Sequence, residues 1–227
     1  MIESIQPILT WSQDRIFAGG SRTIFLLVEW KGISSEEHPR IKSYKVVARE
    51  IELTIWLEPH VTFKRCYGGD MEIGEDGVLH FKLGKIHAGH SNFIGLELSV
   101  SAPVTGKYEA LWLQWQYKKP SVERIREFPL KMLELEYTHH TRNLGDSCCF
   151  HVEKHLELLR TAEVFKEATA MRTRGQHTQA YEQLSRHADK LLLLATRSGD
   201  ISLLKEAETL YKRIELEFQQ RSKVVRN

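Results

Sequence analysis

A change of hydrophobic period near Tyr137 is the feature that most limits what this chain can fold into. Before that point apolar and polar residues alternate, as in segment 49–58, and segments 94–101 and 111–117 repeat the alternation. After Thr138 apolar residues recur every three or four positions instead. A period of two is typical of strands with one buried face, and a period near 3.6 is typical of helices. The sequence therefore predicts a β half followed by a helical half, an α+β chain.

The β half contains about eight candidate strands at close spacing, with no helical segment between them. They are segments 5–11, 23–30, 49–58, 60–66, 78–83, 94–101, 111–117 and 130–137. Turns rich in glycine separate them, among them Ala18–Ser21, Tyr67–Asp70 and Pro103–Gly106. Short strands joined by such turns are typical of antiparallel sandwiches. We predict an antiparallel, immunoglobulin-like β-sandwich over residues 1–137.

The helical half contains three apolar stripes, in segments 152–168, 181–195 and 203–218. Gly175 and the pair Gly199-Asp200 separate them, as helix ends and turns do, and Asp200 is suited to capping the last helix. The run Leu191–Leu194 is wider than one stripe requires, which predicts a middle helix that is central or buried on two sides. We predict a three-helix unit over residues 151–227, joined to the sandwich by a linker at 138–150 that shows neither period.

The charge of the chain is nearly balanced. It has 32 Lys and Arg against 30 Asp and Glu, a formal charge of +2, and 41% hydrophobic residues. This composition excludes a disordered charged tail and makes nucleic acid an unexpected partner. Three cysteines do not form a disulfide framework. The start lacks a signal-peptide pattern, and no apolar run approaches the roughly 20 residues that span a bilayer. We expect a soluble, cytoplasmic protein without membrane contact.

Four segments of the chain follow one another in an order that resembles a known arrangement. They are Ile16–Val28, Leu83–Pro103, Leu111–Tyr117 and Leu158–Glu163. In this order they resemble the regions that flank the von Willebrand factor A domain in bacterial proteins that carry one. The resemblance covers about residues 16–174.

The resemblance implies the accessory β-sandwich and the C-terminal helical region of such proteins, with the A domain itself absent. An A domain needs about 180 residues and an Asp-x-Ser-x-Ser metal motif. Only a short polar loop stands between Trp30 and Tyr44, where such a domain would have to be inserted. The resemblance therefore transfers no metal-binding residue to this chain.

Histidines and cysteines gather around the predicted linker. They are His139, His140, Cys148, Cys149, His151 and His155. Two residues four apart on a helix share one face, so His151 and His155 could both bind a metal, with His140 or Cys149 as a third ligand. The spacing matches no zinc signature, and the alternative interpretation is a solvated linker and helix start. We keep a metal-binding protein or metal-dependent enzyme that uses residues 139–155 as the alternative function. The main prediction, a protein-interaction module, is argued from the tryptophans.

No arrangement of residues typical of catalysis stands out. The chain has no Gly-x-Ser-x-Gly turn, no phosphate-binding glycine loop and no Gly-x-Gly-x-x-Gly after a strand. The second histidine group, His80, His87 and His90, lies around a turn and is interpreted as a surface feature. We therefore expect no enzymatic activity and no cofactor.

The tryptophans give the sharpest indication of function. In the alternating segments Trp115 points with the apolar residues into the core, whereas Trp56 and Trp112 point to the opposite face. An outward indole needs a cover, which can be the chain's own helices, a second subunit or a partner. We predict that Trp56 and Trp112 are partner-binding residues, unless the helices cover them.

These observations predict a non-catalytic protein-interaction or scaffold module of a bacterial cytoplasmic protein. A protein partner or self-association is expected. The alternation further predicts that Leu96 is buried, so that Leu96→Ala destabilises the fold by about 2–5 kcal/mol. Its neighbour Glu97 faces outward, and its replacement by Ala is expected to cost under about 0.5 kcal/mol.

Overall fold

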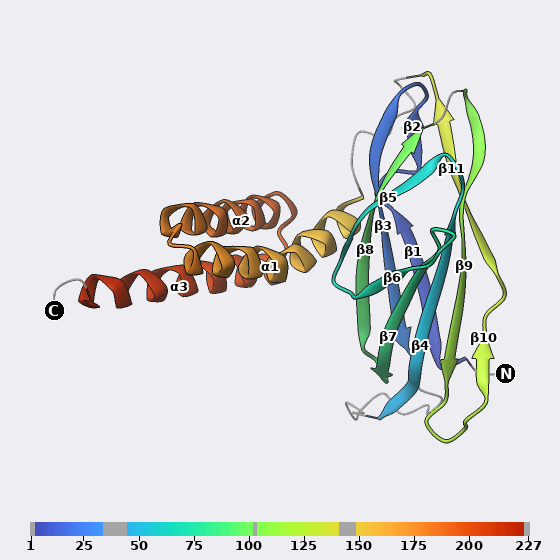
Figure 1. Cartoon of the computed structure of the whole chain (residues 1–227), viewed down its shortest axis with the longest axis horizontal. Helices are drawn as coiled ribbons and strands as arrows, with labels where there is room; N and C mark the ends of the chain where they lie inside the picture. Colours follow the sequence, from blue (N-terminus) through green and yellow to red (C-terminus); the bar gives the residue numbers. More distant parts are fainter. Residues whose placement is uncertain (1–2, 34–44, 102–103, 141–148, 225–227) are drawn as a thin grey trace. The chain divides into compact units, whose positions relative to one another are not determined.

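The chain forms two compact units, which are described separately. The computed structural model describes residues 3–33, 45–101, 104–140 and 149–224, with side chains up to residue 216. The first unit is Met1–His155 and the second is Leu156–Asn227. Eleven strands precede three helices within the described residues (Figure 1). The strands end at Thr138 and the first helix begins at Phe150, while residues 141–148 of the predicted linker lie outside the described residues.

Two sheets face each other in the first unit. The smaller sheet has four strands in the order β1-β3-β8-β5, all antiparallel neighbours. Their bounds are β1 (Ile5–Trp11), β3 (Ser21–Gly32), β8 (Ser91–Ser101) and β5 (Val61–Tyr67). The predicted immunoglobulin-like sandwich followed by three helices is confirmed.

The seven-stranded sheet has the order β2-β11-β9-β4-β7-β6, with β10 also beside β9. Its strands are β2 (Arg15–Phe17), β4 (Val46–Leu57), β6 (Met71–Ile73), β7 (Leu79–His87), β9 (Gly106–Lys118), β10 (Ile125–Glu127) and β11 (Lys131–Thr138). The pairing of β2 with β11 is parallel, which departs from the fully antiparallel expectation. The three-residue strands β2, β6 and β10 are additions that the alternation could not reveal, because so few residues show no period.

The core between the sheets consists of the residues that the alternation placed inside. Leu53, Leu96 and Leu98 are each 0% exposed and belong to this core. Trp115 is buried as predicted, with its ring 6.0 Å from that of Trp30 at an angle of 51°. The face assignments of the long strands are therefore confirmed.

A β-bulge in β9 interrupts its pairing with the last strand, β11. The register of β11 against β9 shifts between Leu133 and Glu134. On β9, Ala110 has no partner on β11, because Leu111 lies opposite Leu133 and Glu109 lies opposite Glu134. Such a bulge places two successive residues of one strand opposite one residue of its partner.

Part of the outer face of the four-stranded sheet is buried as well. Leu27 and Tyr67 both lie opposite Gly95, and each is almost fully buried although neither belongs to the core between the sheets. The Tyr67 hydroxyl donates a 2.5 Å hydrogen bond to Oε2 of Glu97, which also points outward. Residues 150–155, the start of helix α1 (Phe150–Thr173), contact this same face.

In the second unit, helices α2 (His177–Ser198) and α3 (Ile201–Val224) share an apolar cluster that includes Leu191 and Leu203. Gly199 ends α2 in a left-handed conformation, and its N–H donates to the carbonyl oxygen of Ala195 at 2.8 Å. Asp200 caps α3, since its Oδ1 accepts the backbone N–H of Ser202 at 2.9 Å. The predicted turn and cap are confirmed.

The leucine run on α2 is not buried on two sides. Leu191 and Leu194 are buried, but Leu192 is 37% exposed and Leu193 is 71% exposed. Successive residues on a helix are rotated by about 100°, so a run of four cannot face one neighbouring layer. The prediction of a helix buried on two sides was wrong, because α2 presents one packed face.

A polar network lies between α1 and α2. The side chain of Glu157 is only 4% exposed, and its Oε1 accepts hydrogen bonds from Arg160 at 2.7 Å and Lys190 at 2.8 Å. His187 is also buried, and its Nε2 lies 2.9 Å from the Thr161 hydroxyl. The charge of the buried carboxylate is therefore compensated by cations from both helices.

Candidate interaction surface

The predicted partner-binding tryptophans are brought together by the strand register. Trp56 on β4 lies directly opposite Trp112 on β9, and Trp112 lies opposite Met132 on β11. Both indoles are half-buried and neither belongs to the core between the sheets. Three large side chains thus form a row across three adjacent strands on the outer side of the seven-stranded sheet. We call this row and the glutamates beside it the tryptophan face.

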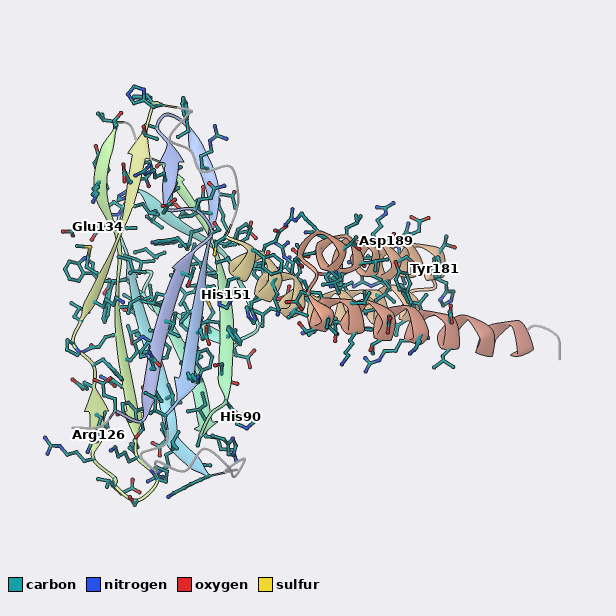
Figure 2. All side chains as sticks on the ribbon, turned by 180° about the vertical axis from the view of Figure 1, so that it is seen from behind. His90, Arg126, Glu134, His151, Tyr181 and Asp189 are labelled. Carbon is teal, nitrogen blue, oxygen red and sulfur yellow. The ribbon has the colours of Figure 1, made fainter. Side chains whose placement is uncertain are left out.

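Three glutamates lie beside the row. Glu58 follows β4, and its Oε1 accepts a 3.2 Å hydrogen bond from Nε1 of Trp112, which fixes the orientation of that indole. Glu109 on β9 lies directly opposite Glu134 on β11, and both side chains are exposed. Figure 2 shows Glu134 pointing away from the sandwich on the outer side of β11. The tryptophan face therefore combines indole surface with carboxylates.

The pairing of Glu109 with Glu134 is unusual because like charges directly opposite each other on adjacent strands are destabilising. Within the described part of the chain, neither carboxylate forms an ion pair. Several other carboxylates of the same sheet are paired. Glu72, for example, accepts a 2.8 Å hydrogen bond from the Lys82 ammonium, which lowers the pKa of Glu72. Glu109 and Glu134 thus place two carboxylates without an ion pair among the described residues on the tryptophan face.

The predicted metal cluster is divided by the fold. His151 and His155 share one face of α1, as their spacing predicts, with ring centroids 4.6 Å apart. The ring of His155 stacks on Phe93 of β8 at 3.8 Å, and Nε2 of His151 lies 3.4 Å from Oε2 of Glu29 on β3. These two histidines therefore join the helix start to the four-stranded sheet, and Figure 2 labels His151 at this contact.

The backbones of the two residues proposed as third ligands are held by hydrogen bonds to the sandwich. The backbone N–H of His140 donates to the Thr138 hydroxyl at 3.1 Å, and the backbone N–H of Cys149 donates to the Ser12 carbonyl oxygen at 2.9 Å. Cys148 lies outside the described residues. Among the residues that the structure describes, no three His, Cys, Asp or Glu side chains gather closely enough to hold a metal ion.

The second histidine group is divided too. His87 and His90 lie beside the turn between β7 and β8, with ring centroids 5.8 Å apart. His80 lies on the outer face of β7, where its Nδ1 is 3.4 Å from the Thr54 hydroxyl. This agrees with the interpretation of these residues as surface histidines.

A cleft of about 490 Å³ opens beside β10. It is lined by Glu3, Tyr117, Arg124, Ile125, Arg126, Glu127 and Phe128. Its two arginines and two glutamates balance in charge, so the lining selects no ligand class by charge. This cleft could not be predicted from the sequence, because β10 is too short to show a period.

Sequence reasoning missed the residues that surround the predicted sites. Phe93 and Glu29 contact the start of α1, and the three glutamates lie beside the tryptophan row. Phe93, Glu29, Glu109 and Glu134 occupy outward positions in their strands, and Glu58 directly follows β4. These residues belong to a site because of the residues that they meet on a neighbouring strand or helix. The local sequence pattern does not show which residues will meet.

No known protein family and no curated protein matches this sequence. Several solved structures are similar in fold. The crystal structure of the ArnB paralog VWA2 from Sulfolobus acidocaldarius matches at 7% identity with a TM-score of 0.55, covering 91% of this chain and 93% of that chain. At this identity the match shows a shared fold and nothing more.

Two further structures are less similar. A von Willebrand factor type A protein from Catenulispora acidiphila has 15% identity and a TM-score of 0.48, over 68% of this chain and 37% of that chain. This chain therefore spans well under half of that protein. A collagen-binding domain from a Staphylococcus aureus adhesin has 8% identity and a TM-score of 0.34, over 57% of this chain and 96% of that chain. Structures similar to this chain thus include proteins named for the von Willebrand A domain.

Within the described residues, no helix is both long enough and apolar enough to cross a membrane.

Proposed function

We propose that this chain is a non-catalytic protein-interaction module and that the tryptophan face is its contact surface. The observation that carries the proposal is the row formed by Trp56, Trp112 and Met132 outside the core. Tryptophan is enriched among the residues that dominate binding energy at interfaces, and methionine adapts to irregular partner surfaces. Leu130, two residues before Met132, adds an apolar side chain that is 50% exposed.

The two outer faces of the sandwich support the proposal by their contrast. On the four-stranded sheet, the start of α1 lies against Phe93 and Glu29, and Leu27 is 1% exposed. The part of α1 that belongs to the sandwich unit thus contacts the sheet without the tryptophans. This leaves the tryptophan face as the candidate for contact with another molecule.

The relation to von Willebrand A proteins is part of the same proposal. We infer from the sequence resemblance that the chain corresponds to the accessory sandwich and helical region of such a bacterial protein, without the A domain. A location in the cytoplasm remains a prediction. Cell fractionation followed by immunodetection would test it, and recovery in an extracellular fraction would contradict it.

Affinity capture with matched variants tests the contact surface. The full chain and the double variant Trp56→Ser/Trp112→Ser serve as baits in a lysate of the source cells. The control is Ile73→Ser, which removes a 59% exposed apolar side chain from β6 of the same sheet. Thermal melting of each bait confirms that it is folded before capture.

We expect a protein that binds the wild type and the control but not the double variant, and that binds again when purified. Sedimentation analysis measures whether the chain self-associates. If the partner is a second copy of the chain, Trp56→Ser should abolish this self-association. Equal binding by all three baits would show that the tryptophan face is not the contact surface.

A further inference from the structure

We propose that the partner meets the tryptophan face with a cationic segment, in which Arg or Lys side chains flank an apolar residue. This inference rests on the proposed function and specifies the chemistry of the partner. It follows from the kinds of group that the strand register places side by side.

The indoles are the first of these groups. A guanidinium or ammonium group is attracted to the face of an aromatic ring, and tryptophan gives the strongest interaction of this kind. Trp56 and Trp112 lie directly opposite each other, so that one cationic side chain can reach both rings. The hydrogen bond from Trp112 to Glu58 holds one indole in place before any partner binds, which lowers the entropy lost on binding.

The carboxylates are the second group, and they favour the same ligand. Glu109 and Glu134 are on opposite positions of β9 and β11, on the same outer side as the tryptophan row. Side chains at opposite positions have Cβ atoms about 4.5–5.5 Å apart, so their repulsion is appreciable. A cation placed between them removes this repulsion and gains two charge-assisted contacts. The indoles and the glutamates therefore both attract positive charge.

The same charges exclude other occupants. Two copies of this chain that met face to face on the tryptophan face would bring six carboxylates together, because Glu58, Glu109 and Glu134 border it on each copy. A nucleic acid or an anionic lipid surface would be repelled for the same reason. Like charges brought together in an interface are strongly unfavourable. A cationic protein segment is the occupant that these residues fit.

Peptide titration of the full chain tests the inference. The probe is a capped nine-residue peptide of Arg, Leu and Gly. The control peptide has Glu in place of each Arg. Calorimetry measures binding to the wild type and to Glu109→Gln/Glu134→Gln. The control variant is Glu72→Gln, which removes a carboxylate of the same sheet that is already paired with Lys82.

We expect the Arg peptide to bind, and the double glutamine variant to bind it about tenfold more weakly than the wild type or the control. Added salt should weaken binding, since exposed charges are screened. Equal binding of the Arg and Glu peptides, or Arg-peptide binding that the double variant leaves unchanged, would overturn the inference.

The two proposals fail in different ways. If the tryptophan variants lose a captured partner while the Arg peptide does not bind, the cationic chemistry is wrong and the contact surface stands. If capture is indifferent to the tryptophan variants, the contact surface itself is wrong.

Discussion

Glu109 and Glu134 show how a single pair of residues can oppose the stability of the fold. Their side chains are exposed and lie at opposite positions of neighbouring strands. Neither contributes to the core, so folding gains nothing from their charge. Residues of this kind are found where binding is favoured at the expense of stability.

Replacing one of these carboxylates should therefore stabilise the sandwich. We expect Glu134→Gln to raise the free energy of unfolding by about 0.2–1 kcal/mol, because it removes repulsion between like charges. The gain should shrink at high salt, where exposed charges are screened. Urea unfolding followed by tryptophan fluorescence measures it. A loss of stability in low salt would show that Glu134 has a compensating partner.

Leu96 and Glu97 show that the energetic importance of an outward residue cannot be judged from strand alternation alone. Leu96 is 0% exposed in the core, as the alternation predicts. Glu97 points outward, as also predicted, but it accepts a 2.5 Å hydrogen bond from the buried Tyr67 hydroxyl. The expectation that Glu97 is energetically unimportant is therefore revised.

We expect Leu96→Ala to destabilise the sandwich by about 2–5 kcal/mol through the cavity that it leaves. Glu97→Ala should cost about 1–3 kcal/mol, because the Tyr67 hydroxyl loses its acceptor. Adding Tyr67→Phe to Glu97→Ala should recover part of that loss. Urea unfolding of the three variants measures these changes, and a cost near zero for Glu97→Ala would remove the role given to the hydrogen bond.

At the scale of the element, α1 differs from the helix that its apolar stripe predicts. Ala162, which the stripe placed inside, is exposed, whereas Glu157 and Thr161 are buried. Polar residues are rarely buried without partners. Here Lys190 and His187 of α2 supply the partners. The position of α1 is thus set partly by polar groups, and a hydrophobic pattern does not reveal buried polar groups.

This network should make the helical unit sensitive to acid. Burial lowers the pKa of His187 below its usual value of 6.5, and Lys190 and Arg160 lower it further, whereas the Glu157 carboxylate opposes the shift. The unfolded chain therefore binds a proton more readily than the folded one. The contribution of the neutral His187 to the free energy of unfolding is fully present above a pH of about 6.5. It is lost as the pH falls through the lower pKa of the folded state.

Urea unfolding monitored by helical circular dichroism at about pH 7.5 and about pH 5.5 measures this effect. The wild type should be less stable at the lower pH, and His187→Gln should show a smaller difference between the two conditions. An equal pH dependence in both proteins would mean that another group titrates.

At the scale of the whole molecule, the chain consists of two compact units whose division falls between His155 and Leu156. The division lies inside α1, because the first residues of that helix pack against the four-stranded sheet. The predicted boundaries at residues 137 and 150 and the linker between them remain predictions, since residues 141–148 are outside the described part.

Limited proteolysis of the full chain tests this organisation. We expect the first cuts within residues 138–150 or within the polar segment 32–43, because paired strands resist cleavage and connecting segments do not. Mass spectrometry of the early fragments identifies the sites. Early cleavage within β4 would be evidence against the strand assignment.

The sequence by itself determined which side chains of the long strands face the core and that a half made of strands precedes a half made of helices. Both properties depend on the local direction of side chains along a strand or helix, so alternation in 49–58 or 111–117 is enough to reveal them. For the same reason the outward direction of Trp56 and Trp112 could be predicted. The turn and cap at Gly199-Asp200 were also local and predictable.

Only the tertiary structure decided what those outward side chains meet. The pairing of β4, β9 and β11 placed Trp56 opposite Trp112 and Glu109 opposite Glu134. The docking of the helix start made His155 a partner of Phe93 and left no described third ligand for a metal. Strand register and helix docking join residues far apart in the chain, and they are fixed by the packing of the whole core. A local pattern therefore predicts the direction of a side chain and cannot predict its neighbour.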